Sequence, residues 1–120
     1  NNKRIKFLGL VSDIKYKKLI NSCVATINIS IEEDFGMSAL EGMSAGKPAI
    51  VVNNGGYLET CIKNYNSFII NKNNIHNDLF NLIKNFDTSL AKKMHKNCII
   101  TSKKFSKENF QKKIEKFYLT

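Results

Sequence analysis

Two carboxylates, those of Glu33 and Glu41, stand eight positions apart around the tight corner Phe35-Gly36. An ionised carboxylate accepts several hydrogen bonds, so such a pair could hold a vicinal ribose diol and the hydroxyls of a sugar. Paired carboxylates also suit hydrolysis of a glycosidic bond, but that chemistry needs both groups across one scissile bond. A glutamate pair at this spacing also arises by chance. The surrounding elements therefore have to decide what the pair does.

Those elements are a strand, an acidic loop and a helix. A β-branched apolar run predicts a buried strand from Val24 to Ser30, and a helix follows from Met37 to Ala45, closed by Gly46 and ended by Pro48. The first backbone N–H groups of such a helix form an anion site, strengthened by the helix dipole. These are the amides of Phe35, Gly36, Met37 and Ser38.

Two further features complete the expected site. Gly36 has no Cβ, so a ligand can approach the backbone closely. Glu41 lies one turn inside the helix, roughly 6–8 Å along its axis, which is about the distance from a diphosphate to its ribose. The simpler alternative is that Glu33 or Asp34 only favours the helix N-terminus electrostatically.

The remaining pattern alternates between strands and helices. It predicts strands at Ile5–Leu8, Ala49–Val52 and Phe68–Ile70, and helices capped at Ser12 or Asp13, Asn74 and Ser106, with others at Tyr57–Lys63 and around Leu90, Met94 and Cys98. The alternation predicts an α/β fold, a Rossmann-like parallel sheet with helices on both faces. The helical spacing of Phe110, Ile114, Phe117 and Tyr118 in the last helix favours a core role over nucleic-acid stacking.

The composition sets the class of protein. The chain has 120 residues and a net charge of +9, with seven basic and six acidic residues in 1–60 and twelve basic and four acidic in 61–120. The basic second half, especially residues 92–116, indicates a phosphate or anionic lipid partner or a solvated helix face. Three cysteines without metal-ligand spacing fit free thiols in a reducing cytoplasm, and no apolar run approaches the ~20 residues of a membrane span.

The central run resembles the donor-binding domain of retaining GT-B glycosyltransferases of group 1 (family 4). The match rests on Ser30, Glu33, Phe35-Gly36 and Glu41, followed by Ala45-Gly46-Lys47-Pro48, an apolar strand and Gly55-Gly56-x-x-Glu59. It covers residues 7 to about 70, since Phe7-Leu8-Gly9 and Val11-Ser12-Asp13 also match. The resemblance implies that residues 1–120 are part of the C-terminal domain of a GT-B fold, with 106–120 as its C-terminal helix and the N-terminal acceptor domain absent.

The resemblance also implies individual roles. Glu33 would contact the transferred sugar as the catalytic-site residue, and Glu41 would hold the ribose. The donor would be bound further by Phe35, Gly36, Met37 and Ser38 at the helix start and by Gly55 and Gly56 in the open turn. The donor would be a nucleotide-diphosphate sugar, UDP- or GDP-type, and the resemblance implies no metal and no other cofactor.

The chain departs from this pattern at Asp34, where the family usually has Gly, and at Ile29, where Pro is frequent. The basic residues that neutralise the diphosphate lie upstream of this sequence in the family, and Lys47, at the far end of the helix, is a poor substitute. We therefore expect an inactive part of a bacterial-type hexosyl transferase that builds a surface polysaccharide or glycolipid. We expect it in the cytoplasm, with peripheral attachment to the inner membrane face left open.

The expected partners are the nucleotide-sugar donor and a sugar or lipid-linked acceptor bound by the missing domain, with an anionic membrane surface left open and no nucleic acid. Two alternatives stay open: a non-catalytic nucleotide- or partner-binding module, and a basic peripheral membrane-binding module that uses residues 92–116.

Overall fold

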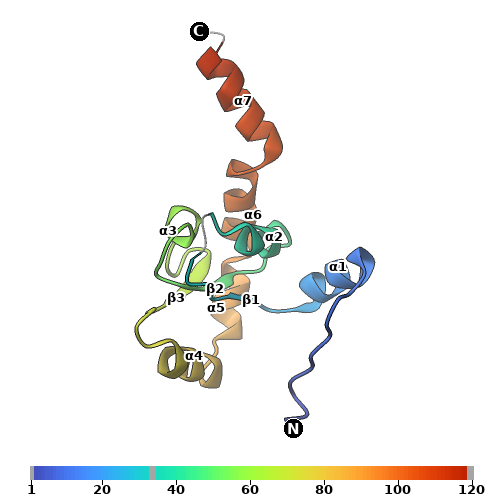
Figure 1. Ribbon diagram of the computed structural model, residues 1–120, viewed down its shortest axis with the longest axis vertical. Helices are drawn as coiled ribbons and strands as arrows, with labels where there is room; N and C mark the ends of the chain where they lie inside the picture. Colours follow the sequence, from blue (N-terminus) through green and yellow to red (C-terminus); the bar gives the residue numbers. More distant parts are fainter. Residues whose placement is uncertain (1, 33–34, 119–120) are drawn as a thin grey trace.

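The computed structural model describes residues 2–32 and 35–118 (Figure 1). Three strands form its sheet in the order β1-β2-β3: β1 (Thr26–Asn28), β2 (Ala49–Val52) and β3 (Ser67–Ile70). Both pairings are parallel, and Ala49 of β2 pairs with Thr26 on one side and Ser67 on the other. The α/β fold with a parallel sheet is therefore confirmed.

Seven helices lie in the described part of the chain: α1 (Asp13–Ser22), α2 (Met37–Ser44), α3 (Tyr57–Thr60), α4 (Ile75–Lys84), α5 (Thr88–Lys93), α6 (His95–Lys104) and α7 (Lys107–Tyr118). In Figure 1, α2 lies above the strands and α4 lies below them. Two of the expected caps are present, since Ser12 Oγ accepts from Lys15 N–H and Ser106 Oγ accepts from Asn109 N–H, both at 3.3 Å. None of the helices in the described ranges is long and apolar enough to cross a membrane.

The core is built around β2, whose four residues are all buried. α2 packs on β1 and β2 and also against α6, which brings Met43, Met94 and Cys98 into one apolar cluster. Burial raises the pKa of the Cys98 thiol to about 12, with a smaller contribution from the nearby thiol of Cys61. The expectation of free thiols agrees with the structure, where Cys61 and Cys98 are buried and Cys23 is half-buried.

The strand expected at Ile5–Leu8 is wrong. These residues are irregular coil, and Phe7 is 98% exposed. A strand is stable only when its backbone groups pair with a neighbour, and in the described residues β1 pairs with β2 alone. The apolar run has no such partner and therefore stays irregular.

Three helix predictions need smaller corrections. The helix after the glycine turn ends at Thr60 rather than Lys63, because Ile62 N–H donates to Asn66 Oδ1 at 2.8 Å instead of continuing the helix. Asn74 is the N-cap residue of α4, but its side chain makes no capping bond and donates to Asp78. The helix around Met94 is divided there into α5 and α6.

The core role expected for the aromatic residues of α7 is also wrong. Phe110 is 62% exposed and Phe117 is 80% exposed, and no residue of α7 is buried. In Figure 1 this helix extends away from the sheet. Helical spacing predicts which side chains share a face, but burial needs a second element packed against that face.

Candidate functional site

Two loops meet at the carboxyl-terminal edge of the sheet. One loop follows β1 and leads to α2, and the other follows β2 and leads to α3. The side-chain amide of Asn54 donates to the carbonyl of Ile31, which joins the two loops. Asn53 ties the second loop to the end of β3, since its N–H donates to the carbonyl of Ile70 at 3.0 Å. Ligands of parallel α/β sheets bind at this edge, so these loops define the candidate site.

The N-terminus of α2 opens at this edge. Its N-cap is Gly36, in the left-handed region with φ of 78°, and glycine has no side chain of its own to cap the helix. The carbonyl of Gly36 accepts from Ala39 N–H at 3.1 Å and from Leu40 N–H at 3.3 Å. The amides of Met37 and Ser38 belong to the first turn and have no partner within the helix, and both residues are exposed. This is the arrangement that an anion site needs.

Packing against Tyr57 explains why position 36 is a glycine. A Cβ at this position would lie 3.0 Å from Cδ1 of Tyr57 and 3.3 Å from its Cε1. Gly36 and Tyr57 are both buried. The missing side chain therefore makes room for the Tyr57 ring of α3, whereas the sequence suggested that it makes room for a ligand.

A basic cleft lies beside the start of α2. The ring of Phe35 makes an edge-to-face contact with Phe105, with centroids 5.6 Å apart. The cleft around this pair has a volume of about 410 Å³ and is lined by Phe35, Met37, Lys104, Phe105, Lys107, Phe110 and Lys113. Three lysines from the end of α6 and from α7 thus stand near the first amides of α2. Sequence reasoning noted the basic tail but could not place it here.

Glu41 has a partner that the sequence did not predict. The hydroxyl of Tyr16 on α1 donates to Oε2 of Glu41 at 2.8 Å. This hydrogen bond, together with partial burial and the negative charge of Glu41, raises the pKa of Tyr16. Both side chains line a cavity of about 420 Å³ between α1 and α2. Glu41 is exposed and keeps its other carboxylate oxygen available for a ligand hydroxyl.

The two glycines of the second loop differ in conformation. Gly55 is exposed and has a φ of 57°, a value that favours glycine. Gly56 is buried and has helical angles, φ −63° and ψ −17°, as the N-cap of α3. Glu33, expected to contact the transferred sugar, lies outside the described residues, as does Asp34.

The comparisons with known proteins agree with this geometry. The family model described as "Glycosyl transferases group 1" matches residues 1–105. The chain belongs to the group 1 glycosyltransferases. An uncharacterised glycosyltransferase of Methanocaldococcus jannaschii is 34% identical over 121 residues, which is 98% of this chain and 34% of that protein. The alpha-1,3/1,6-mannosyltransferase ALG2 of Dictyostelium discoideum is 40% identical over 68 residues, 57% of this chain and 16% of that protein.

Solved structures show the same fold. Anabaena HepE in complex with UDP matches with a TM-score of 0.72 and 25% identity, over 95% of this chain and 32% of HepE. Its complex with UDP-glucose matches with a TM-score of 0.71 and 24% identity, over 97% of this chain and 32% of HepE. These neighbours are GT-B glycosyltransferases, and this group 1 chain spans 34% or less of the proteins compared above.

Within this group 1 domain, Phe35, Met37 and Ser38 lie at the start of α2, where Phe35 and Met37 line the cleft with α6 and α7. Glu41 lies one turn further on and faces the cavity shared with α1, and Asn54 joins the loop of the Gly55-Gly56 turn to Ile31. Lys47 follows the other end of α2, about 12 Å away at ~1.5 Å per residue. In the described ranges, no group of three or more His, Cys, Asp or Glu residues could hold a metal ion.

Proposed function

We propose that this chain forms part of the nucleotide-sugar donor site of a retaining family 4 glycosyltransferase. The observation that carries the proposal is the open N-terminus of α2 at the carboxyl edge of the sheet, with Glu41 one turn inside the helix. In this arrangement the amides of Met37 and Ser38 hold the distal phosphate. The carboxylate of Glu41 holds the ribose diol, and Glu33 contacts the hydroxyls of the transferred sugar.

The chemistry is assigned to charge stabilisation of the leaving group. The bond between the anomeric carbon and the phosphate oxygen breaks, and a bond to the oxygen of the acceptor hydroxyl forms on the same face of the sugar, while the proton of that hydroxyl passes to the leaving phosphate oxygen. The nucleoside diphosphate then leaves with its negative charge, which the α2 amides and dipole stabilise in a fixed arrangement. Lys104, Lys107 and Lys113 stand beside that helix start and add positive charge. No metal is assigned to this step.

The similar proteins guide the choice of donor. HepE is seen with UDP and UDP-glucose, and ALG2 is named a mannosyltransferase. We therefore assign a hexose donor carried on UDP or GDP, and an acceptor in surface polysaccharide or glycolipid synthesis at the cytoplasmic side of a membrane. Because the chain spans at most 34% of the relatives described above, the acceptor is assigned to a further part of a longer protein.

Replacement of Glu41 tests the ribose contact. Glu41→Ala removes hydrogen bonds to a charged acceptor, which are worth about 1.5–3 kcal/mol, so we expect nucleotide affinity to fall by about 10- to 100-fold. Calorimetric titration with UDP, GDP and their hexose derivatives measures this loss and identifies the base. Glu115→Ala, an exposed carboxylate on α7, changes net charge equally and should leave affinity unaltered. Equal affinity in the Glu41→Ala and unmodified proteins would remove Glu41 from the ribose role.

An activity assay tests whether this chain supplies the donor site alone, with the acceptor bound by another part of a longer protein. We expect the 120-residue chain to bind donor weakly and to transfer no sugar, because no acceptor site is assigned to it. A radiolabelled-donor assay with sugar and lipid-linked acceptors measures transfer directly. Transfer by this chain alone would contradict the assignment of the acceptor site to another part of the protein. If a longer form with an acceptor-binding part binds donor and still transfers nothing, the chain is a non-catalytic nucleotide-binding module instead.

A further inference from the structure

A further cavity lies at the opposite, amino-terminal edge of the sheet. It has a volume of about 550 Å³ and is lined by Cys23, Val24, Gly46, Lys47, Ala91, Lys92, Lys93, His95 and Lys96. Cys23 and Val24 lie just before β1, separated from it by Ala25, and Gly46 and Lys47 lie just before β2, separated from it by Pro48. Because the strands are parallel, these segments enter the sheet at the edge farthest from the loops of the candidate donor site.

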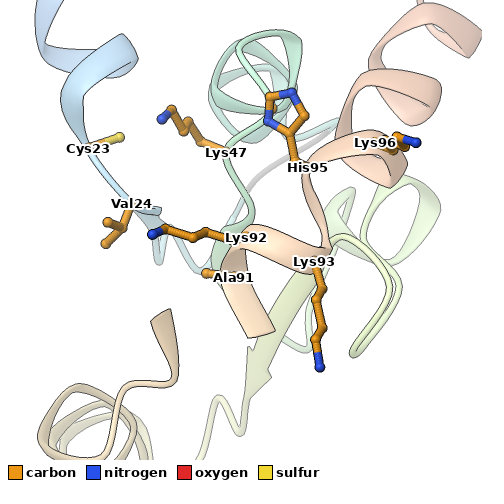
Figure 2. Close-up of a pocket in the computed structure, with 9 residues that line it drawn as sticks. Cys23, Val24, Lys47, Ala91, Lys92, Lys93, His95 and Lys96 are labelled. Atoms are coloured by element: carbon orange, nitrogen blue, oxygen red, sulfur yellow. The ribbon is translucent and has the colours of Figure 1, made fainter. Parts of the chain in front are cut away.

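The charged side chains that line this cavity are all basic. Five of its nine lining residues are basic and none is acidic, counted over the described residues. Figure 2 shows the side chains of Lys47 and Lys92 extending to the same side, towards Cys23 and Val24, with His95 standing beside Lys47. Lys93 and Lys96 point in other directions. Two ammonium groups therefore face one opening that has an apolar wall.

Gly46 lets His95 reach this position. Gly46 is buried and has a φ of +76°, and a Cβ there would lie 2.1 Å from Nδ1 of His95 and 2.2 Å from its Cε1. The imidazole therefore occupies the space that any other side chain at position 46 would fill. His95 begins α6 and Lys47 follows α2, so the packing of α6 against α2 brings these two basic groups together.

Lysine side chains supply positive charge at this cavity. Lysine ammonium groups are compact point charges that bind phosphate without a fixed geometry. A volume of this size is within the range of small-molecule sites, roughly 300–1,000 Å³.

We infer that this cavity binds a phosphate-bearing anion through Lys47 and Lys92, with His95 beside them, independently of the donor edge. The ligand chemistry is a phosphomonoester or diphosphate, supplied either by a free phosphorylated compound or by the head group of an anionic lipid. The apolar wall of Val24 and Cys23 would contact the carbon part of either molecule.

Nitrogen-15 correlation spectra of the chain, titrated with pyrophosphate, locate the binding. We expect the amides of residues 46–47 and 92–96 to shift. In Lys47→Gln/Lys92→Gln these shifts should require about tenfold more pyrophosphate, because two charge-assisted contacts are lost. Lys15→Gln/Lys72→Gln removes two exposed lysines elsewhere and should leave the titration unchanged. Shifts confined to residues 35–38 and 104–113, or equal losses in both double variants, would overturn the inference.

Vesicle sedimentation separates the two sources of phosphate. A lipid head group is identified if phosphatidylglycerol vesicles sediment the protein and pure phosphatidylcholine vesicles do not. This binding should be lost in Lys47→Gln/Lys92→Gln. Pyrophosphate binding without vesicle binding would identify a free phosphorylated compound, and both results support the site. A thermal unfolding midpoint within error of the unmodified protein shows that each variant is folded. Failure of nucleotide binding in the Glu41 experiment would not affect this test. Pyrophosphate binding in the cavity is followed through the amides of residues 46–47 and 92–96, which lie outside the proposed donor site.

Discussion

The hydrogen bond between Tyr16 and Glu41 adds a second residue to the proposed ribose site. Tyr16 comes 25 positions before its partner and sits on a different helix. Its hydroxyl donates to one carboxylate oxygen of Glu41 and so restricts the rotamers of this side chain, which lies on an exposed face of α2. A carboxylate held in place loses less side-chain entropy when a ligand binds. Tyr16 is therefore a positioning residue for Glu41.

Titration of Tyr16 checks this contact. Its raised pKa means that the folded protein keeps the phenol proton more tightly than the unfolded chain does. The contact therefore stabilises the fold fully below the ordinary tyrosine pKa of about 10, and this stabilisation is lost as pH rises through the raised value. Carbon-13 NMR of labelled tyrosines, with the Tyr16 signal assigned by its absence in Tyr16→Phe, measures the pKa. In Glu41→Gln it should fall towards the ordinary value, and an unchanged value would show that Glu41 is not the cause.

At the scale of elements, α2 organises the molecule. Its eight residues run from the proposed donor edge of the sheet to the basic cavity at the other edge, and it packs on both β1 and α6. A Cβ on Gly42 would lie 2.7 Å from Cγ2 of Thr26, so this glycine allows the helix to approach β1 closely. The position of α2 thus depends on a small residue facing the strand as well as on its apolar side chains.

A buried polar network holds α6 to the chain before β3. Asn66 is fully buried, and its amide nitrogen donates to the carbonyl of Thr60 at 3.0 Å and to Oγ1 of Thr101 at 2.9 Å. Its oxygen accepts from Ile62 N–H at 2.8 Å. One side chain therefore joins the end of α3, the approach to β3 and the middle of α6.

Removal of this network should be costly. Asn66→Ala removes three hydrogen bonds, two of them to the buried residues Thr60 and Thr101. A buried polar group left unsatisfied costs about 1–3 kcal/mol, and we expect a total loss of roughly 2–5 kcal/mol after local relaxation. Chemical denaturation with circular dichroism detection measures the free energy of unfolding. Asn85→Ala removes an amide that is exposed at the end of α4 and should change it by less than about 0.5 kcal/mol. Similar small losses in both variants would refute the network's role.

At the scale of the whole molecule, apolar surface is uncovered at β1, which in the described residues pairs with β2 alone. Val24, shortly before this strand, is 50% exposed, and Ile27 within it is 51% exposed. An edge strand with exposed apolar side chains can pair with a second chain. The net charge of +9 opposes such association through repulsion between copies.

We therefore expect the chain to self-associate, and to do so more strongly as salt screens its charge. Ile27→Lys should weaken the association by placing a charge on the β1 edge. Sedimentation equilibrium at low and high salt measures the monomer fraction. Ile100→Lys on α6 makes the same change at a side chain that is 46% exposed, and it should have a smaller effect. Equal effects of the two substitutions would place the interface elsewhere.

The parallel α/β order and the position of α2 follow from the sequence by itself. These features depend on local physics: β-branched runs form strands, Gly46 accepts a positive φ at a helix end, and Pro48 prevents further helix. The same local rules place Glu41 one helical turn after the Phe35-Gly36 corner. Local rules failed at Ile5–Leu8 and in α7, where a strand or a buried helix face needs a partner element.

Only the tertiary structure decided which distant residues share a site. Tyr16 meets Glu41, Lys104 and Lys107 stand beside the start of α2, and His95 lies over Gly46. Each of these contacts joins residues far apart in the sequence, and the last two depend on how α6 and α7 are placed against α2. Such placement is the sum of many packing contacts across the core, which no short stretch of sequence contains.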